Sequence, residues 1–452
     1  MTGAQAFPER HLESRVTAIA KGEYARRRRQ LMDQLEPNSI AIIPAASLAI
    51  RSRDTEYPFR QDSDFYYLTG FPEADAVAVL LPGRAHGDYV LFCLEKDPQE
   101  ELWHGERIGA EAACERYGAA DAFPLADIDD ILPGLIEGRG RVYYSMGRRR
   151  DFDARVMAWV NSIRAREAAG AVPPGDFTDL DHLLHEQRLF KSAAELRQMR
   201  RAGAISVAAH IRAMRQCRPG IYEYQLEAEL LHEFARHGAR SAAYPSIVAA
   251  GSNACTMHYT ANAAKLKRGD LVLIDAGCEY RGYAADITRT FPASGRFNRR
   301  QRRLYDVVLR AQEAAFAALR PGADWNSPHD ASVEEITRGL IDLGLLQGNL
   351  RRLIKTGAYR RFYMHRVGHW LGLDVHDVGD YRPGGQWRTL EAGMALTVEP
   401  GIYIAADDSD VPAAWRGLGV RIEDDVLITA DGSELLTPGL PRTPDEIEAV
   451  MQ

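Results

Sequence analysis

Two aspartates in the 452-residue chain have a spacing that would bring their side chains together. Asp275 closes an apolar run, and Asp286 follows eleven residues later, beyond a glycine-containing segment. Two β-rich runs around such a segment predict a hairpin. With Tyr280 and Arg281 as the two loop residues, Asp275 would lie directly opposite Asp286, with their Cβ atoms about 5 Å apart on one face.

Like charges placed in this way destabilise a sheet unless a proton or a cation lies between them. Because the run before Asp275 is apolar, water would solvate its carboxylate poorly, and we favour a pair of metal ligands. The alternatives are a slipped register, or one aspartate solvated at the end of its strand.

Three histidines lie within twelve residues: His365, His369 and His376. A helical zinc pair at His365 and His369 is not expected, since Arg366 stands where the HExxH motif has its glutamate, and nearby glycines weaken a helix. A single histidine would usually be an ordinary core or surface residue. Three close to Gly-rich turns favour a role in binding or catalysis.

Two glutamates are also out of place for ordinary strand residues. Glu399 ends an apolar run that a Pro-Gly turn closes, and Glu423 lies in the run 419–428. Alternation along that run puts Glu423 on the same face as Arg421. The simpler alternative for each glutamate is an edge position or a salt bridge, and Glu423 could pair with Arg421.

Together these residues form a candidate metal set of four carboxylates and one imidazole: Asp275, Asp286, His369, Glu399 and Glu423. Burying four anions without cations would cost too much free energy, and two divalent ions would neutralise them. Oxygen-rich ligation favours Mn²⁺, with Zn²⁺ or Co²⁺ as alternatives, and no cysteine joins the set to suggest a structural zinc site. Two such ions activate water and polarise a carbonyl, which is hydrolase chemistry.

The residues before this set predict a separate α/β domain. Short runs at 76–81 and 89–92 are typical of strands, and Val156, Val160 and Ile163 recur at helical spacing. Mixed strands and helices of this kind indicate an α/β domain between about 36 and 165.

A long helix then marks the start of a second domain. Ser192 and Glu195 have the spacing of a capping box. An apolar stripe follows, with Leu196, Met199, Gly203, Val207, Ile211 and Met214, and Pro219-Gly220 ends it. Gly203 would cost about 1 kcal/mol relative to Ala unless a close-packed neighbour needs the room. We expect domains at 1–188 and 189–452.

Composition limits the partners of the chain. Lys and Arg number 56 against 63 Asp and Glu, a net charge of −7, which argues against nucleic acid as a partner. Apolar residues make up 46%, as in globular proteins, and the longest apolar stretch, 40–50, is too short to cross a bilayer. No secretory signal is visible, and five cysteines without a CxxC pair favour a cytoplasmic protein.

The ordered series Asp, Asp, His, Glu, Glu resembles the pita-bread metallopeptidases, and most closely the bacterial aminopeptidase P (Xaa-Pro aminopeptidase) family. The resemblance covers nearly the whole chain and includes the stretches 54–71, 188–192 and 237–240. It implies an α/β (α+β) protein with a C-terminal pita-bread catalytic domain, whose curved antiparallel sheet is backed by helices. A smaller α/β N-terminal domain would precede it.

The resemblance also implies metal positions and a reaction. Asp275 and Asp286 would bind one Mn²⁺, His369 and Glu399 the other, with Asp286 and Glu423 bridging both. Members of the family hydrolyse the bond between an N-terminal residue and a following proline, through a hydroxide that bridges the two metals. Glu399 would assist as general base.

Further residues would shape the substrate pocket. By the same resemblance, His376 would stabilise the intermediate or shuttle a proton, and His258, His365 and Arg421 would surround the proline and the group that follows it. Tyr403 would line the same site.

The implied assembly is a homodimer or homotetramer. Asp54 and Trp103, from the N-terminal domain of an adjacent subunit, would approach the ammonium group of the substrate, although Asp54 could equally form a surface ion pair. Two other functions stay open at this point. Prolidase, a Xaa-Pro dipeptidase, shares all five ligands, and a non-catalytic relative would bind protein or peptide partners but typically lacks ligands.

Overall fold

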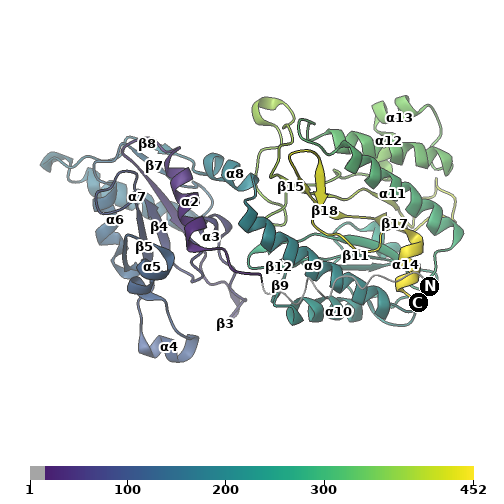
Figure 1. Ribbon diagram of the computed structural model, residues 1–452, viewed down its shortest axis with the longest axis horizontal. Helices are drawn as coiled ribbons and strands as arrows, with labels where there is room; N and C mark the ends of the chain where they lie inside the picture. Colours follow the sequence, from purple (N-terminus) through teal and green to yellow (C-terminus); the bar gives the residue numbers. More distant parts are fainter. Residues whose placement is uncertain (1–15) are drawn as a thin grey trace. The chain divides into compact units, whose positions relative to one another are not determined.

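The computed structural model describes residues 16–452, and the chain divides into two compact units (Figure 1). The smaller unit is Ala18–Arg188, and the larger comprises Leu189–Gln452 together with Val16 and Thr17. No helix in this described part of the chain is both long enough and apolar enough to cross a membrane.

The smaller unit is built on a mixed six-stranded sheet in the order β6-β5-β4-β1-β7-β8. Its strands are β1 (Ser39–Pro44), β4 (Val77–Leu80), β5 (Tyr89–Cys93), β6 (Asp121–Pro124), β7 (Arg141–Tyr143) and β8 (Asp176–Thr178), with a separate hairpin of β2 (Ile50–Ser52) and β3 (Thr55–Glu56). The helices are α2 (Lys21–Met32), α3 (Ser63–Thr69), α4 (Pro98–His104), α5 (Gly109–Tyr117), α6 (Ile128–Ile136), α7 (Arg150–Arg164) and α8 (Asp181–Leu189).

The local predictions for this unit are confirmed. The two apolar runs form β4 and β5, which pair antiparallel and are fully buried. Val156, Val160 and Ile163 all face inward from α7. Val156 and Ile163 belong to the apolar core that α6 and the sheet share, and an apolar helix stripe gains stability only when it is packed against another apolar surface.

Every strand pair that the structure describes in the larger unit is antiparallel. They belong to four small sheets, ordered β10-β11-β14, β13-β12-β9, β15-β18-β19 and β16-β17. The strands are β9 (Ser241–Ala242), β10 (Ile247–Ala250), β11 (Leu271–Asp275), β12 (Cys278–Tyr280), β13 (Tyr283–Ala284), β14 (Thr288–Pro292), β15 (Ala395–Val398), β16 (Gly401–Ile404), β17 (Leu418–Arg421), β18 (Asp424–Ile428) and β19 (Ser433–Leu435).

Helices flank these strands in the larger unit (Figure 1). They are α9 (Ala193–Gln216), α10 (Glu223–Arg236), α11 (Arg299–Ala318), α12 (Ser327–Asp342), α13 (Leu350–Thr356) and α14 (Pro444–Val450). One apolar core joins residues of α9, α10, α11 and α12 to residues of β10, β11, β14, β16 and β17. The architecture is the predicted one, antiparallel strands backed by helices.

Helix α9 has the predicted capping box, in which Ser192 and Glu195 each satisfy the other's backbone N–H. The helix ends at Gln216, before Pro219, which fits the predicted stop. Gly203 is needed for close packing, since a Cβ at this position would lie 2.5 Å from the carbonyl oxygen of Leu436. The close-packed neighbour therefore explains why a glycine stands in the middle of this helix.

The two faces of strand β11 pack in different clusters. Val272 and Ile274 belong to the large core that the helices share. Leu273, on the opposite face, packs with Tyr403 in a smaller cluster. Because successive side chains alternate along a strand, Asp275 lies on the face of Leu273 and points away from the large core.

Candidate active site

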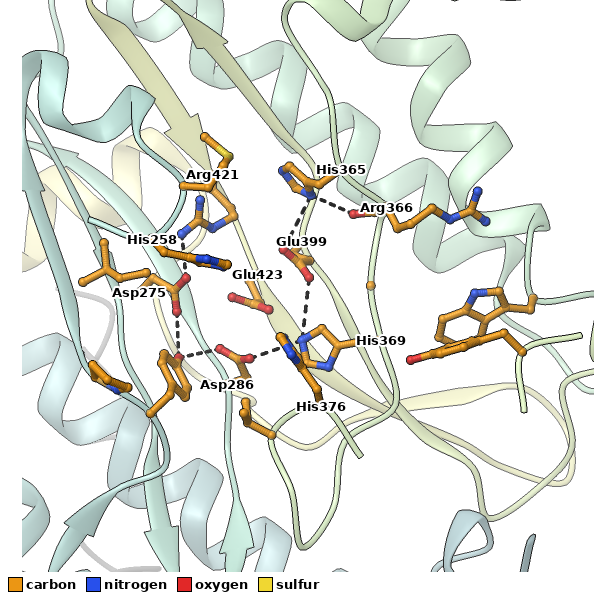
Figure 2. Close-up of a pocket in the computed structure, with 18 of the residues that line it drawn as sticks. His258, Asp275, Asp286, His365, Arg366, His369, His376, Glu399, Arg421 and Glu423 are labelled. Carbon is orange, nitrogen blue, oxygen red and sulfur yellow. Dashed lines mark hydrogen bonds and ion pairs between the residues drawn. The ribbon is translucent and has the colours of Figure 1, made fainter. Parts of the chain in front are cut away.

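The five candidate metal ligands come from five separate segments of the larger unit and line one pocket of about 920 Å³ (Figure 2). Asp275 ends β11, and Asp286 lies between β13 and β14. His369 lies in the segment beside β15, Glu399 directly follows β15, and Glu423 lies between β17 and β18. The pocket therefore brings together the whole set that the sequence predicted.

The hairpin that carries the two aspartates is present, but its predicted register is wrong. Asp275 pairs with Thr288, and Tyr280 pairs with Tyr283. The loop residues are Arg281 and Gly282, with φ of 52° and 85°, which is the left-handed pair that a tight type I′ turn requires. A shift of two residues keeps every side chain on its face, so Asp286 still lies on the same face as Asp275.

Tyr244 joins the two aspartates. Its hydroxyl lies 2.7 Å from Asp275 Oδ1 and also contacts Asp286 Oδ1. A tyrosine hydroxyl has a single hydrogen, which one carboxylate at a time can accept. Two carboxylates that converge on it therefore call for a further proton or a cation between them.

His369 is held in position by the strand beside it. Its backbone N–H donates to Thr397 Oγ1 at 3.1 Å, and its carbonyl accepts the Thr397 N–H at 3.0 Å. Its Nδ1 lies 2.9 Å from the carbonyl oxygen of Trp370, so Nδ1 carries a hydrogen and Nε2 is directed to the pocket.

Two carboxylates surround Nε2 of His369. It lies 3.4 Å from Asp286 Oδ2 and 3.7 Å from Glu399 Oε1. Burial opposes a charge on this imidazole, but the hydrogen bond to Asp286 and the charge of Glu399 outweigh burial and raise its pKa to about 9. The carboxylates that favour a proton on this ring would also attract a divalent cation to it.

Glu423 is only 2% exposed. Its Oε2 accepts a hydrogen bond from Thr288 Oγ1 at 2.6 Å. The simpler alternative, a salt bridge to Arg421, does not occur among the described residues: Arg421 Nη2 instead contacts Asp275 Oδ2 at 2.6 Å. Burial, together with Asp286 and the other carboxylates, raises the pKa of Glu423 well above its usual value.

The charges of the site do not balance within the protein. Burial raises the pKa of Asp275 and brings that of Glu399 to about 7. Asp425, whose carboxylate accepts the backbone N–H of Asp286, also has a raised pKa because it is buried. Among the described residues, the positive groups that pair with these acids are the Arg421 guanidinium and the His369 imidazole, which are fewer than the acids. The site thus fits a cation, and Asp286, His369 and Glu423 offer ligand atoms within 4.8 Å of one another.

His365 and Tyr403 form one wall of the pocket. His365 Nε2 lies 2.9 Å from the Tyr403 hydroxyl, which accepts a hydrogen bond from Arg421 Nη1 at 3.0 Å. His365 Nδ1 lies 3.7 Å from Glu399 Oε2. Burial and the nearby Arg421 charge lower the pKa of His365 to about 3, so this ring is neutral at physiological pH. Since residues 363–376 form no helix, the rejection of the helical zinc pair is confirmed.

His376 and His258 also line the pocket, and both are exposed. The His376 ring packs edge-on against that of His369, with the centroids 4.3 Å apart. Partial burial and the His369 charge lower the pKa of His376. Figure 2 shows the rings of His258 and His376 directed toward the carboxylates.

A buried glutamate fixes the segment that carries His258. Glu223, at the start of α10, is fully buried. One of its oxygens accepts from the backbone N–H of Ala250 and from Asn253, and the other from the Tyr259 hydroxyl and the backbone N–H of Ala264, at 2.7–3.0 Å. Four donors satisfy the carboxylate and tie both ends of the segment to α10.

Asp54 and Trp103 are not among the residues that this pocket brings together. Both belong to the smaller unit. Asp54 is exposed in the turn between β2 and β3, and Trp103 is 80% exposed on α4.

Sequence reasoning missed three residues that contact the site. Thr288 could have been found, since it lies two residues after Asp286 and alternation places both on one face. Asp425 follows Glu423 by the same interval. Tyr244 carries no such signal, because it reaches the aspartates from a segment 31 residues away in sequence.

Comparison with known proteins decides the family. Residues 197–430 match the model of metallopeptidase family M24. The chain belongs to this family. Residues 24–143 match the model of the aminopeptidase P N-terminal domain. The protein is therefore a metal-dependent hydrolase with an M24 catalytic domain, and the predicted fold class is confirmed.

Known relatives match it along almost their full length. Xaa-Pro aminopeptidase of Escherichia coli K12 is 46% identical over 439 residues, which cover 96% of this chain and 99% of that protein. A solved Pseudomonas aeruginosa aminopeptidase is 62% identical with a TM-score of 0.95, covering 96% of this chain and 98% of that one. Zinc-substituted E. coli aminopeptidase P in complex with product is 46% identical with a TM-score of 0.94, covering 96% and 99%.

Proposed function

We propose that this M24 metallopeptidase is a Xaa-Pro aminopeptidase, which releases the N-terminal residue from peptides with proline in second position. The observation that carries the proposal is the pocket itself, where four buried or half-buried carboxylates converge with His369 beside the neutral ring of His365. The names of relatives that match 96% of the chain support the same substrate class.

Five residues would hold two divalent ions, which we expect to be Mn²⁺. Asp275 and Asp286 would bind one ion and His369 and Glu399 the other, with Asp286 and Glu423 shared. When bound, the ions would polarise the scissile carbonyl and lower the pKa of water. The donor set supports this choice, because it is rich in carboxylate oxygens and contains no thiolate.

The remaining pocket residues would handle protons and position the substrate. Glu399 would act as general base, since its half-buried carboxylate lines the pocket beside His369 and can accept a proton there. The exposed ring of His376 would move a proton to or from the reacting groups. His258, His365 and Tyr403 would enclose the proline ring, which offers no N–H for recognition, so that shape must position it.

Arg421 would contribute to the pocket mainly through its neighbours. Its guanidinium is 5% exposed as a side chain and contacts Asp275, Tyr403 and Thr288. We propose that it orients the tyrosine hydroxyl and holds the first aspartate in place at the inner wall of the substrate site.

The smaller unit would serve assembly and substrate binding. We propose a domain of residues 1–188 that supports a homodimer or homotetramer, in which Asp54 and Trp103 of an adjacent subunit approach the ammonium group of the substrate. The 80% exposure of Trp103 supports such a use, because a large apolar side chain is rarely left in water without a partner. The five free cysteines support a reducing compartment, and we propose the cytoplasm.

The test compares peptides of different length. Purified protein treated with EDTA should be inactive, and Mn²⁺ should restore release of the first residue from Xaa-Pro-Yaa. The control is Xaa-Ala-Yaa, which should be cleaved far more slowly. Preference for the Xaa-Pro dipeptide would assign the protein as a prolidase instead, and no cleavage of either peptide with Mn²⁺ would refute the proposal.

A further inference from the structure

Two arginines and a tryptophan form a cationic wall on the same pocket. The guanidinium carbon of Arg382 lies 3.7 Å from the ring centroid of Trp387, and that of Arg366 lies 4.7 Å from it. All three residues line the pocket that contains the carboxylates. Stacking on an indole restricts both guanidiniums and keeps them in place in solution.

The two arginines of this wall have no carboxylate partner. Among the described residues, neither Arg366 nor Arg382 forms an ion pair. Arg366 Nη2 donates to the neutral side-chain oxygen of Asn326. The charge of Asp330 also acts on it, and that carboxylate accepts a hydrogen bond from the Asn326 amide at 2.7 Å. Both guanidiniums are exposed and keep donors free for a ligand.

Arg421 lines the same pocket but differs from them in its burial and in its ion pairing. It is buried and already paired with Asp275 at 2.6 Å. Asp275 therefore already neutralises its charge, and Arg421 is poorly suited to bind a second carboxylate from the substrate. An anionic group in the pocket would find its unpaired cations at Arg366 and Arg382.

The direction of the Arg366 side chain fits a group remote from the reacting bond. Its backbone adjoins His365, whose ring lies 3.7 Å from Glu399. Its guanidinium extends away from the carboxylates (Figure 2). In a Xaa-Pro-Yaa tripeptide the terminal carboxylate is two residues beyond the scissile carbonyl, roughly 7 Å along an extended chain.

We propose that Arg366 and Arg382, supported by Trp387, bind a carboxylate of the substrate that lies beyond the proline. This inference rests on the proposed function and adds a preference within it. The carboxylate has two sources, the C-terminus of a tripeptide or the side chain of Asp or Glu in third position. Either source offers the planar group that a guanidinium binds through two parallel hydrogen bonds.

The experiment compares a neutral peptide, Xaa-Pro-Ala-amide, with two peptides that carry a carboxylate beyond the proline, Xaa-Pro-Ala and Xaa-Pro-Glu-amide. Wild-type protein should cleave at least one of the two carboxylate peptides with kcat/KM about threefold to tenfold above the neutral amide, an effect the size of one or two exposed ion pairs. A preference for Xaa-Pro-Ala identifies the C-terminus as the ligand, and one for Xaa-Pro-Glu-amide identifies the side chain. The advantage should shrink at high salt, because exposed charges are screened.

Variants then assign the preference to the wall. Arg366→Gln with Arg382→Gln should abolish it by raising KM for the carboxylate peptide, with little change in kcat/KM for the neutral amide. Arg351→Ala is the matched control, since it removes one exposed arginine from α13 outside the pocket and should leave the preference intact.

Each failure has a separate meaning. If wild-type protein cleaves all three peptides equally well, the carboxylate subsite is refuted while the aminopeptidase proposal stands. If the double variant keeps the full preference, the wall is not its source. If none of the three peptides is cleaved with Mn²⁺ present, the proposed function itself fails.

Discussion

Lys191 Nζ lies 2.8 Å from Asp377 Oδ2, and both side chains are 1% exposed. Lys191 precedes α9, and its backbone N–H donates to Gly393. Asp377 directly follows His376, and its N–H donates to the carbonyl oxygen of Trp370. This buried ion pair thus ties the start of α9 to the loop that carries both His369 and His376.

Breaking this pair should cost both stability and activity. Asp377→Asn removes the charge of one partner of this buried ion pair, and breaking such a pair typically costs about 3–5 kcal/mol of unfolding free energy. Denaturant unfolding of metal-loaded protein measures this loss, and kcat should fall because the two histidines lose their support. The double variant Lys191→Met with Asp377→Leu should lose less than the two single losses combined. Single variants within 1 kcal/mol of wild type would refute the argument.

Replacing Asp286 by Asn should abolish activity and leave the fold intact. The carboxylate lies between Tyr244 and Nε2 of His369, so its removal takes one anion from the centre of the candidate metal site. Metal content after dialysis should fall with turnover on Xaa-Pro-Yaa. Asp431→Asn, in an exposed turn, is the control and should keep both. Normal turnover by Asp286→Asn would contradict the dinuclear site.

Glu399 should make the metal-stripped protein less stable as the pH rises. Burial raises its pKa from 4.5 to about 7, so between these values the folded chain keeps a proton that the unfolded chain releases. More protons bound to the folded state means that stability falls with increasing pH. Glu399→Gln lacks this titration and should gain on the order of 1–3 kcal/mol relative to wild type between pH 4.5 and 8. Parallel unfolding curves for the two proteins across this range would refute the shift.

The same substitution should have opposite effects in two helices. Gly203→Ala places a Cβ 2.5 Å from the Leu436 carbonyl oxygen, and the forced shift should cost about 1–3 kcal/mol. Gly134→Ala, in α6, meets no atom within 4 Å and should stabilise its helix by about 0.5–1 kcal/mol. Thermal unfolding of each variant beside wild type checks both signs. A stabilised Gly203→Ala would show that the segment after β19, which contains Leu436, moves aside.

Local signals predicted the helices and strands better than the register in which the strands pair. The capping box and apolar stripe identified α9 because both depend on neighbours within one or two turns. The hairpin and the shared face of Asp275 and Asp286 were also correct. The register was wrong by two residues because the loop was placed at Tyr280 and Arg281. Only the pair Arg281–Gly282 puts a glycine in the second left-handed position.

The residues of the candidate site were predicted as a set, but the contacts between their side chains were not. Charge balance alone indicates that four acids need cations, whichever strand pairs with which. It does not indicate that Arg421 chooses Asp275 over Glu423, because that choice depends on how β17 lies against β11. Tyr244 was missed for the same reason: its contact exists only once the chain is folded.

Glu223 has a consequence for the motion of the segment that carries His258. Its four hydrogen bonds make the first turn of α10 and the segment from Ala250 to Ala264 one unit, so neither can detach without exposing a buried carboxylate. The amide hydrogens of Ala250 and Ala264 should therefore exchange with solvent at a common rate, set by one cooperative local opening. The segment that carries His258 would then open and close as one cooperative unit.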